Sequence, residues 1–215
     1  LRGWRTGAWW SFAGCGFLLA AAMYTYQAAW IVPFLMIPVA AHLWWHSRRI
    51  EGNRSWRDAT PGVNGRRRLI GASVAVGVAV VLVLPFAWFF VQNPHLLLLR
   101  PLQLAVGSVN ENGRPVQGDV WHNLRANVLM FVPAGNTGDI NPRRNVPGEA
   151  ALTWWMFLPF VIGGGLALRR LSTPAYSIPL IGLVGMLLPC VFSENAPHFH
   201  RVLGAVAPTA LLCGL

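Results

Sequence analysis

The feature that most constrains this chain is a series of apolar runs, each about as long as a membrane is thick. Residues 8–45 form one apolar tract, which a short polar stretch at 24–29 interrupts. A helix needs about 20 apolar residues to cross the hydrocarbon core of a bilayer. We therefore divide this tract into two spans and interpret the other apolar runs in the same way. The predicted spans cover about residues 7–24, 28–46, 68–91, 152–168, 174–192 and 200–215.

The composition agrees with a membrane protein and excludes an ordinary water-soluble domain. Of the 215 residues, 54% are hydrophobic and only 11% are charged, about half the charged fraction of a typical soluble domain. Six spans joined by polar loops predict an all-α fold, a polytopic bundle of transmembrane helices. Because the chain begins at Leu1 and ends within an apolar run at Leu215, we expect residues 1–215 to be one membrane-embedded fragment of a larger transmembrane domain.

The basic residues orient the predicted spans. All 17 are arginine, and they give the chain a net charge of +10. They are dense in the loop 47–68, in the turn at 169–170 and ahead of the first span, and with six spans these three places lie on one side. The positive-inside rule makes that side cytoplasmic, so the long loop 92–151 is predicted to be extracytoplasmic. Because the arginines flank apolar runs, the lipid bilayer is the expected partner and nucleic acid is not.

Part of the long external loop has the pattern of an amphipathic helix. In residues 119–132, apolar side chains recur at helical spacing, and Asp119 is placed to cap the helix. The side chains of this stripe are Trp121, Leu124, Val128 and Phe131. The pattern predicts a short interfacial helix at the membrane surface. A helix packed on a small external domain is the alternative.

Two arginines stand together in the next part of this loop. Residues 135–152 are rich in turn formers and place Asp139, Arg143, Arg144 and Asn145 close together before the fourth predicted span. Paired arginines on an external loop usually face solvent. At headgroup depth they can instead bind a lipid phosphate, which a guanidinium group contacts with two parallel hydrogen bonds.

A second charged stretch lies between the last two apolar runs. Pro197 suits the first turn of a helix, which would place His198 and Arg201 on one face, with Glu194 near enough to pair with either of them. Such a paired group at a helix N-terminus makes a good anion site. The alternative is a simple interfacial turn that carries its charges to water.

Small residues inside the apolar runs add two expectations. Cys15, Cys190 and Cys213 are isolated from one another in sequence, which predicts buried thiols rather than a metal site or a disulfide framework. The three glycines at 163–165 predict close packing of one helix against a neighbour.

Four segments of the chain resemble a known family of membrane enzymes. They are YTYQAAWIVP at 24–33, GDINPRRNVPGEAALTWW at 138–155, GGGLALRR at 163–170 and ENAPHFHRVLGAVAP at 194–208. Together they resemble the C-terminal half of the membrane segment of bacterial glycosyltransferase family 39-like proteins. That family belongs to the GT-C class, with protein O-mannosyltransferases and aminoarabinose lipid A transferases. Trp30, Arg144 and His200 stand where the family pattern commonly has Arg, His and Leu.

The resemblance implies an activity and a place for it. It implies a glycosyltransferase of the bacterial cytoplasmic (inner) membrane that transfers a sugar from a polyprenyl-phosphate donor to an acceptor hydroxyl on the extracytoplasmic face. It also implies that the general base is an Asp in an external loop outside these residues, so no catalytic residue is assigned here. No cofactor and no metal are predicted. By residue match, the donor phosphate would be bound by Asp139, Arg143, Arg144, Asn145, Glu194, His198 and Arg201, with Tyr24 and Tyr26 as possible substrate-lining residues.

Two other classes of function stay open from the sequence. A transporter or flippase of a lipid-linked or anionic substrate needs polar residues at mid-membrane depth, and the predicted span interiors carry almost none. A non-catalytic membrane scaffold predicts that the outer polar groups are dispensable.

Overall fold

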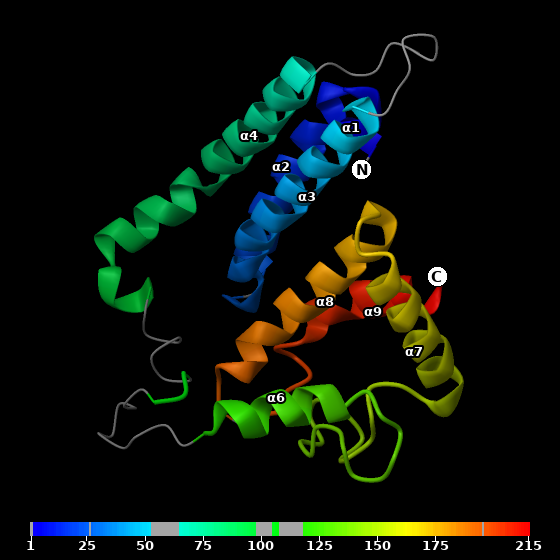
Figure 1. Cartoon of the computed structure of the whole chain (residues 1–215). Helices are drawn as coiled ribbons and strands as arrows, with labels where there is room; N and C mark the ends of the chain where they lie inside the picture. The colour runs from blue at the N-terminus through cyan, green and yellow to red at the C-terminus, as the bar shows by residue number, and fades with distance from the viewer. Residues whose placement is uncertain (1, 26, 53–64, 98–104, 108–117, 195) are drawn as a thin grey trace. The chain divides into compact units, whose positions relative to one another are not determined.

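The structure is a computed structural model that describes most of the chain. The described residues are 2–25, 27–52, 65–97, 105–107, 118–194 and 196–215. Within these ranges the regular elements are helices (Figure 1), and one isolated antiparallel bridge joins Ala105 to Ser193. The predicted all-α fold class is confirmed. The chain divides into two compact units, which are Leu1–Pro33 with Ser47–Leu97, and Phe34–His46 with Leu98–Leu215.

The first unit is built from apolar helices that pack at small residues. Its elements are α1 (Arg2–Thr6), α2 (Trp9–Thr25), the 3-10 helix η1 (Gln27–Ile31), both ends of α3 (Val32–Gly52) and α4 (Gly65–Gln92). Helices α2 and α4 approach closely at Gly16, where any side chain would overlap the carbonyl oxygen of Ala75. The hydroxyl of Tyr24 donates to the carbonyl oxygen of Leu82 at 2.8 Å, which links the same two helices again.

The second unit carries the polar loops of interest. Its elements are the middle of α3, α6 (Val120–Leu129), α7 (Trp154–Arg169), α8 (Pro174–Val191), the 3-10 helix η2 (Leu203–Ala205) and α9 (Val206–Cys213). Its buried core is formed by Met130, Phe131, Leu152, Ala167, Leu183, Cys190, Val202, Ala205 and Leu212. The close packing expected at the triple glycine is confirmed at Gly163, where a side chain would overlap the carbonyl oxygen of Leu212 in α9.

Three of the described helices are long and apolar enough to cross a membrane. They cover Gln27–Arg49, Gly65–Gln92 and Pro174–Val191, and each coincides with a predicted span. Helices also form over the other predicted spans, but α2 has 17 residues, α7 has 16 and α9 has 8. A crossing helix needs about 20 residues. The helices are therefore compatible with an integral membrane protein, and a bundle of six spans remains a prediction.

The exterior of the described helices is strongly apolar. Trp155 is 90% exposed, and Trp10 and Phe34 are also exposed. Several polar side chains are buried instead, namely Asn123, Asn127, Asp139, Ser177, Ser193, Arg201 and Thr209. Large exposed apolar surface is unfavourable in water but suits lipid, in which polar groups must find their partners inside the protein. The surface is therefore also compatible with a membrane environment.

The three cysteines are free thiols with different surroundings. Cys190 is buried in the core of the second unit, and Cys213 is half-buried. Cys15 is exposed on α2, so the prediction of three buried thiols is wrong for this residue. The reason is that the apolar face of α2 which carries Cys15 belongs to the exposed surface rather than to a packed core.

Candidate functional site

The first polar loop of the second unit lies between α6 and α7. Within residues 135–149 the main-chain N–H of Asn141 donates to Oδ1 of Asp139, and that of Arg143 donates to Oδ1 of Asn141, each at 3.0 Å. The N–H of Arg144 donates to the carbonyl of Asn141 at 3.0 Å and completes one turn. Asp and Asn favour such turns because their side chains bind main-chain N–H groups two residues ahead. The paired arginines are therefore carried by a locally ordered turn.

Two glycines close the base of this loop. The N–H of Gly138 donates to the carbonyl of Gly148 at 3.0 Å, and the N–H of Gly148 donates to the carbonyl of Asp139 at 3.1 Å. Gly148 has φ of +79°, which side-chain-bearing residues rarely adopt, and a side chain on Gly138 would overlap the carbonyl of Glu149. Asn145 adds a bond from Nδ2 to the same Glu149 carbonyl at 2.7 Å. Asn145 is therefore a structural member of the loop.

The second polar loop, residues 193–202, links α8 to η2, and its conformation corrects the sequence-based expectation. The predicted helix beginning at Pro197 is wrong, because residues 199–202 form turns and regular helix begins only with η2. The N–H of Arg201 donates to the carbonyl of His198 at 2.9 Å, which forms a single turn. The guanidinium of Arg201 donates to the carbonyl of Glu194, just ahead of the predicted helix start.

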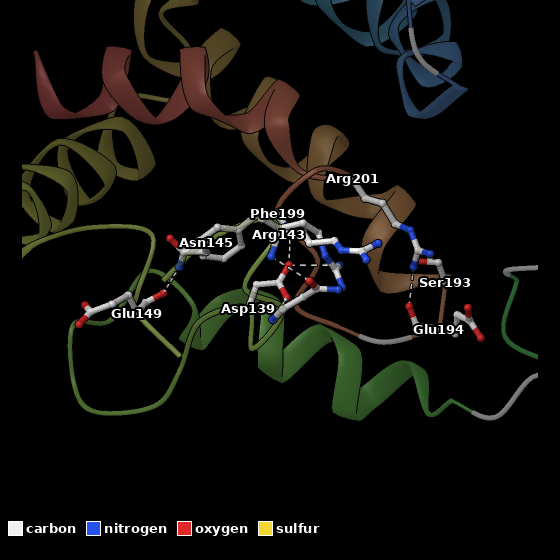
Figure 2. A network of polar contacts seen from close by, with 10 residues as sticks. Asp139, Arg143, Asn145, Glu149, Ser193, Glu194, Phe199 and Arg201 are labelled. Carbon is white, nitrogen blue, oxygen red and sulfur yellow. Dashed lines mark hydrogen bonds and ion pairs between the residues drawn. The ribbon is translucent and has the colours of Figure 1, made fainter. Parts of the chain in front are cut away.

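Arg201 is buried and holds this corner together. Its Nη1 donates to Oγ of Ser193 at 2.7 Å as well as to the carbonyl of Glu194. The predicted partner was the carboxylate of Glu194, but the bond goes to the main chain, and the carboxylate is turned away from the guanidinium (Figure 2). Arg201 is therefore placed to fix the path of the chain.

Asp139 joins the two loops. Its Oδ2 accepts the main-chain N–H of Phe199 at 3.0 Å (Figure 2). The same oxygen lies 3.1 Å from Nη1 of Arg144. The carboxylate is 2% exposed, so these contacts are shielded from solvent. The sequence placed Asp139 and Arg144 in one site with the corner at residues 194–201, and the structure brings them together. We name this contact between residues 139–145 and 193–201 the loop–corner junction.

Helix α6 supports the junction through buried amides that the sequence analysis did not single out. Asp119 caps α6 as predicted, accepting from the N–H groups of Trp121 and His122. Asn123 donates from Nδ2 to the carbonyls of Val191 and Ser193 at 3.1 and 2.8 Å. The spacing of Asn123 and Asn127, one helical turn apart in α6, was the available signal.

The second of these amides completes the support. Asn127 is fully buried and donates from Nδ2 to the carbonyl of Asn123 at 2.8 Å. Its Oδ1 is also buried and accepts no hydrogen bond from the described residues. Because a buried amide is costly unless it is bonded, the bonds of Asn123 to the end of α8 favour the orientation of α6 that turns both amides inward.

His198 lies among cations at the junction and is held in its neutral form. Burial, followed by the positive charges of Arg201 and Arg144, lowers the pKa of His198 from its ordinary value of 6.5 to about 4, against an opposing effect of Asp139. Its Nδ1 is buried and makes no hydrogen bond with a described residue. At neutral pH the imidazole can therefore donate or accept a hydrogen bond without adding charge.

The two adjacent arginines, Arg143 and Arg144, differ in their burial and in their contacts. Arg143 is exposed. Arg144 is mostly buried and pairs with Asp139, but the N–H of its Nη1 is not aligned for a hydrogen bond with the carboxylate. With Arg201, the junction holds three guanidinium groups against the carboxylates of Asp139 and Glu194. Its excess of positive charge suits an anionic ligand.

The loop–corner junction is defined without the two tyrosines of the predicted site. Tyr24 lies in the first unit, where its hydroxyl binds the main chain of α4. Tyr26 lies outside the described residues. A substrate-lining role for either tyrosine stays a prediction.

A cluster of metal-ligating side chains is not present in the part of the chain that the structure describes. Among those residues, no group of three or more His, Cys, Asp or Glu side chains is placed to hold a metal ion. The guanidinium and main-chain N–H groups at the junction are hydrogen-bond donors and suit an anion.

Comparison with known proteins adds no identification. No protein-family model, curated protein or solved structure matches this chain. The fold and the site define a class of protein. Its described residues form helices, three of them long and apolar enough to cross a membrane, and two loops meet at a positively charged junction. The residues of the loop–corner junction are therefore the basis for assigning a function.

Proposed function

We propose that this protein is a membrane glycosyltransferase of the GT-C class, similar to bacterial glycosyltransferase family 39-like proteins. In this proposal the loop–corner junction binds the phosphate of a polyprenyl-phosphate sugar donor, and the sugar passes to an acceptor hydroxyl. The observation that carries the proposal is the bond between Asp139 and Phe199, which holds two segments resembling that family at one cationic place.

Sugar transfer requires a site that stabilises the negative charge of a phosphate, and the junction has suitable cationic groups. When the sugar leaves its donor, negative charge develops on the departing polyprenyl phosphate. Guanidinium groups that are already oriented in a poorly hydrated site stabilise such charge well. Arg143 is exposed and is able to turn its donors toward phosphate oxygens, and Arg144 has a buried Nη1 that makes no hydrogen bond with a described residue.

The other residues of the predicted set have distinct parts in this proposal. Asp139 and Arg201 are positioning residues, because Asp139 orders the loop and Arg201 orders the corner through Ser193 and Glu194. His198 is a neutral hydrogen-bonding group beside the phosphate. Burial, followed by the positive charges of Arg201 and Arg144, lowers its pKa and disfavours protonation.

In this proposal the general base is not one of the junction residues. The family resemblance implies an Asp in another external loop. Asp139 is a poor base because its carboxylate is buried and already accepts two N–H groups and an ion pair. The junction would then supply the donor-phosphate half of the active site, and a separate carboxylate would activate the acceptor hydroxyl.

The expected location follows from the charge pattern of the loops. We place the protein in the bacterial cytoplasmic membrane as a bundle of six spans, with the arginine-rich loop 47–68 inside. The loop 92–151 and the junction then face outward. Support comes from the three helices of sufficient length and from the apolar exterior.

A transfer assay in vesicles tests the proposal. The full-length protein is reconstituted with a polyprenyl phosphate that carries a radiolabelled hexose, and an envelope fraction from the same bacterium supplies acceptors. We expect transfer in the wild type and a loss of at least tenfold in Arg143→Ala, with Arg169→Ala as a matched control because Arg169 is an exposed arginine at the end of α7. Transfer that is unchanged in Arg143→Ala argues against the phosphate role. Label that crosses the bilayer without transfer identifies a transporter or flippase instead.

A further inference from the structure

Helix α6 has an inverted distribution of side chains. Its amides Asn123 and Asn127 are 2% and 0% exposed, whereas Trp121 is 75% exposed and Leu124 and Val128 are also exposed. These three apolar residues follow the spacing i, i+3 and i+7, so they share one face. The stripe predicted from sequence is therefore only partly correct, because these three residues face away from the protein whereas its fourth member, Phe131, is buried in the core.

Such a distribution is the reverse of that in a helix on the surface of a water-soluble protein. A helix in water turns its apolar face to the core and its amides to solvent. Where lipid replaces water, polar side chains pack against the protein and apolar side chains face outward. The burial pattern of α6 therefore fits a helix that contacts lipid on its Trp121 side.

The depth of α6 follows from what it is bonded to. Asn123 donates to the carbonyls of Val191 and Ser193, where α8 ends. Helix α8 is long and apolar enough to span a membrane, so its end lies near the headgroup region. On the exposed surface of α6, Arg125 and His122 accompany the apolar stripe, which is the mixture found at a membrane surface.

The start of α7 provides independent support for this depth. The N–H of Ala151 donates to the carbonyl of Met130 at 2.7 Å, which ties the end of α6 to the segment just before α7. Helix α7 then begins with Trp154 and Trp155, which are 63% and 90% exposed. Exposed tryptophans gather at the boundary between headgroups and acyl chains. Two neighbouring elements therefore present tryptophan at the same boundary.

We propose that α6 is an interfacial anchor, with Trp121, Leu124 and Val128 embedded at the boundary between lipid headgroups and acyl chains. The apolar face of α6 therefore contacts the lipid bilayer itself. The anchor holds the loop–corner junction at headgroup depth, because the junction is tied to α6 through Ser193. This inference does not require that the protein is an enzyme.

Spin labels on the full-length protein test the anchor. Cys15 and Cys213 are replaced by serine, while Cys190 is kept because it is buried and shielded from the label. Single cysteines at 121, 124 and 128 are labelled in vesicles of phosphatidylethanolamine and phosphatidylglycerol, and Arg125→Cys gives the matched control. We expect the three apolar positions to collide mainly with dissolved oxygen, which concentrates in lipid, and position 125 to collide mainly with a water-soluble nickel chelate.

Two other results would overturn the proposal. If positions 121, 124 and 128 collide mainly with the nickel chelate, the stripe faces water. If the labels are immobile and collide with neither reagent, another protein or a second copy covers the stripe. Circular dichroism and gel filtration of each labelled variant exclude misfolding as the cause of either result.

Discussion

The main-chain N–H of Phe199 donates to Oδ2 of Asp139 at 3.0 Å, between residues 60 positions apart in the sequence. The same carboxylate accepts the N–H of Asn141 through Oδ1 and pairs with Arg144. One buried side chain therefore orders a loop, orients an arginine and attaches the corner at residues 193–201. The proposed phosphate site depends on this arrangement more than on any single cation.

Replacing Asp139 should destabilise the protein. Asp139→Ala removes the acceptor for two N–H groups in a buried place and leaves Arg144 without its carboxylate. Because an unsatisfied buried polar group costs about 1–3 kcal/mol, we expect the free energy of unfolding to fall by about 2–5 kcal/mol. Reversible unfolding in mixed micelles measures this change. Glu149→Ala is the matched control, since Glu149 is an exposed acid on the same loop, and a similar loss in both variants would contradict the structural role of Asp139.

Acidification should weaken the folded state through His198. Its pKa in the folded protein is about 4, below the ordinary 6.5, so the unfolded chain binds the proton more readily. The free energy of unfolding should therefore fall as the pH is lowered from about 6.5 to about 4. His198→Gln removes the titrating group and should flatten this part of the pH profile. His200→Gln, at an exposed position of the same corner, should leave the profile as in the wild type. Parallel profiles for His198→Gln and the wild type would count against a neutral, buried His198.

Adjacent glycines of α7 should respond differently to alanine. In Gly163→Ala the new methyl group would overlap the carbonyl of Leu212, so we expect a loss of about 1–3 kcal/mol or more as α7 and α9 separate. In Gly164→Ala the methyl group meets open space, and the better helix propensity of alanine should leave stability unchanged or raise it by up to about 1 kcal/mol. Thermal unfolding of the two variants in the same detergent makes the comparison. Equal effects would show that α7 and α9 do not pack through Gly163.

The helices were predictable because long apolar runs have few alternatives. The runs at 68–91 and 174–192 became α4 and α8 with small shifts in their bounds. The Asp119 cap and the stripe of α6 followed from local rules for helix starts and periodicity. The family resemblance led us to expect that the loop at residues 139–145 lies close to the corner at residues 193–201. The bond between Asp139 and Phe199 gives the physical reason for this closeness.

The conformation of the corner was not predictable from local rules. Pro197 suits the start of a helix, but the carbonyl of Glu194 is bonded by Arg201, a contact that depends on the folded chain. The inward orientation of Asn123 was missed for the same reason, because its partners lie at the end of α8. Periodicity separates the faces of a helix but does not say whether water or lipid lies outside.

The most direct measurement for the phosphate site is photo-cross-linking with a polyprenyl phosphate that carries a diazirine next to its phosphate. The full-length protein is irradiated in vesicles, and the labelled peptides are identified by mass spectrometry. We expect label within residues 139–145 and 194–201, and a loss of at least tenfold in the double variant Arg143→Ala with Arg144→Ala, but not in Arg169→Ala. Label confined to other segments, or labelling of the double variant at the wild-type level, would contradict the assignment of the loop–corner junction as the donor-phosphate site.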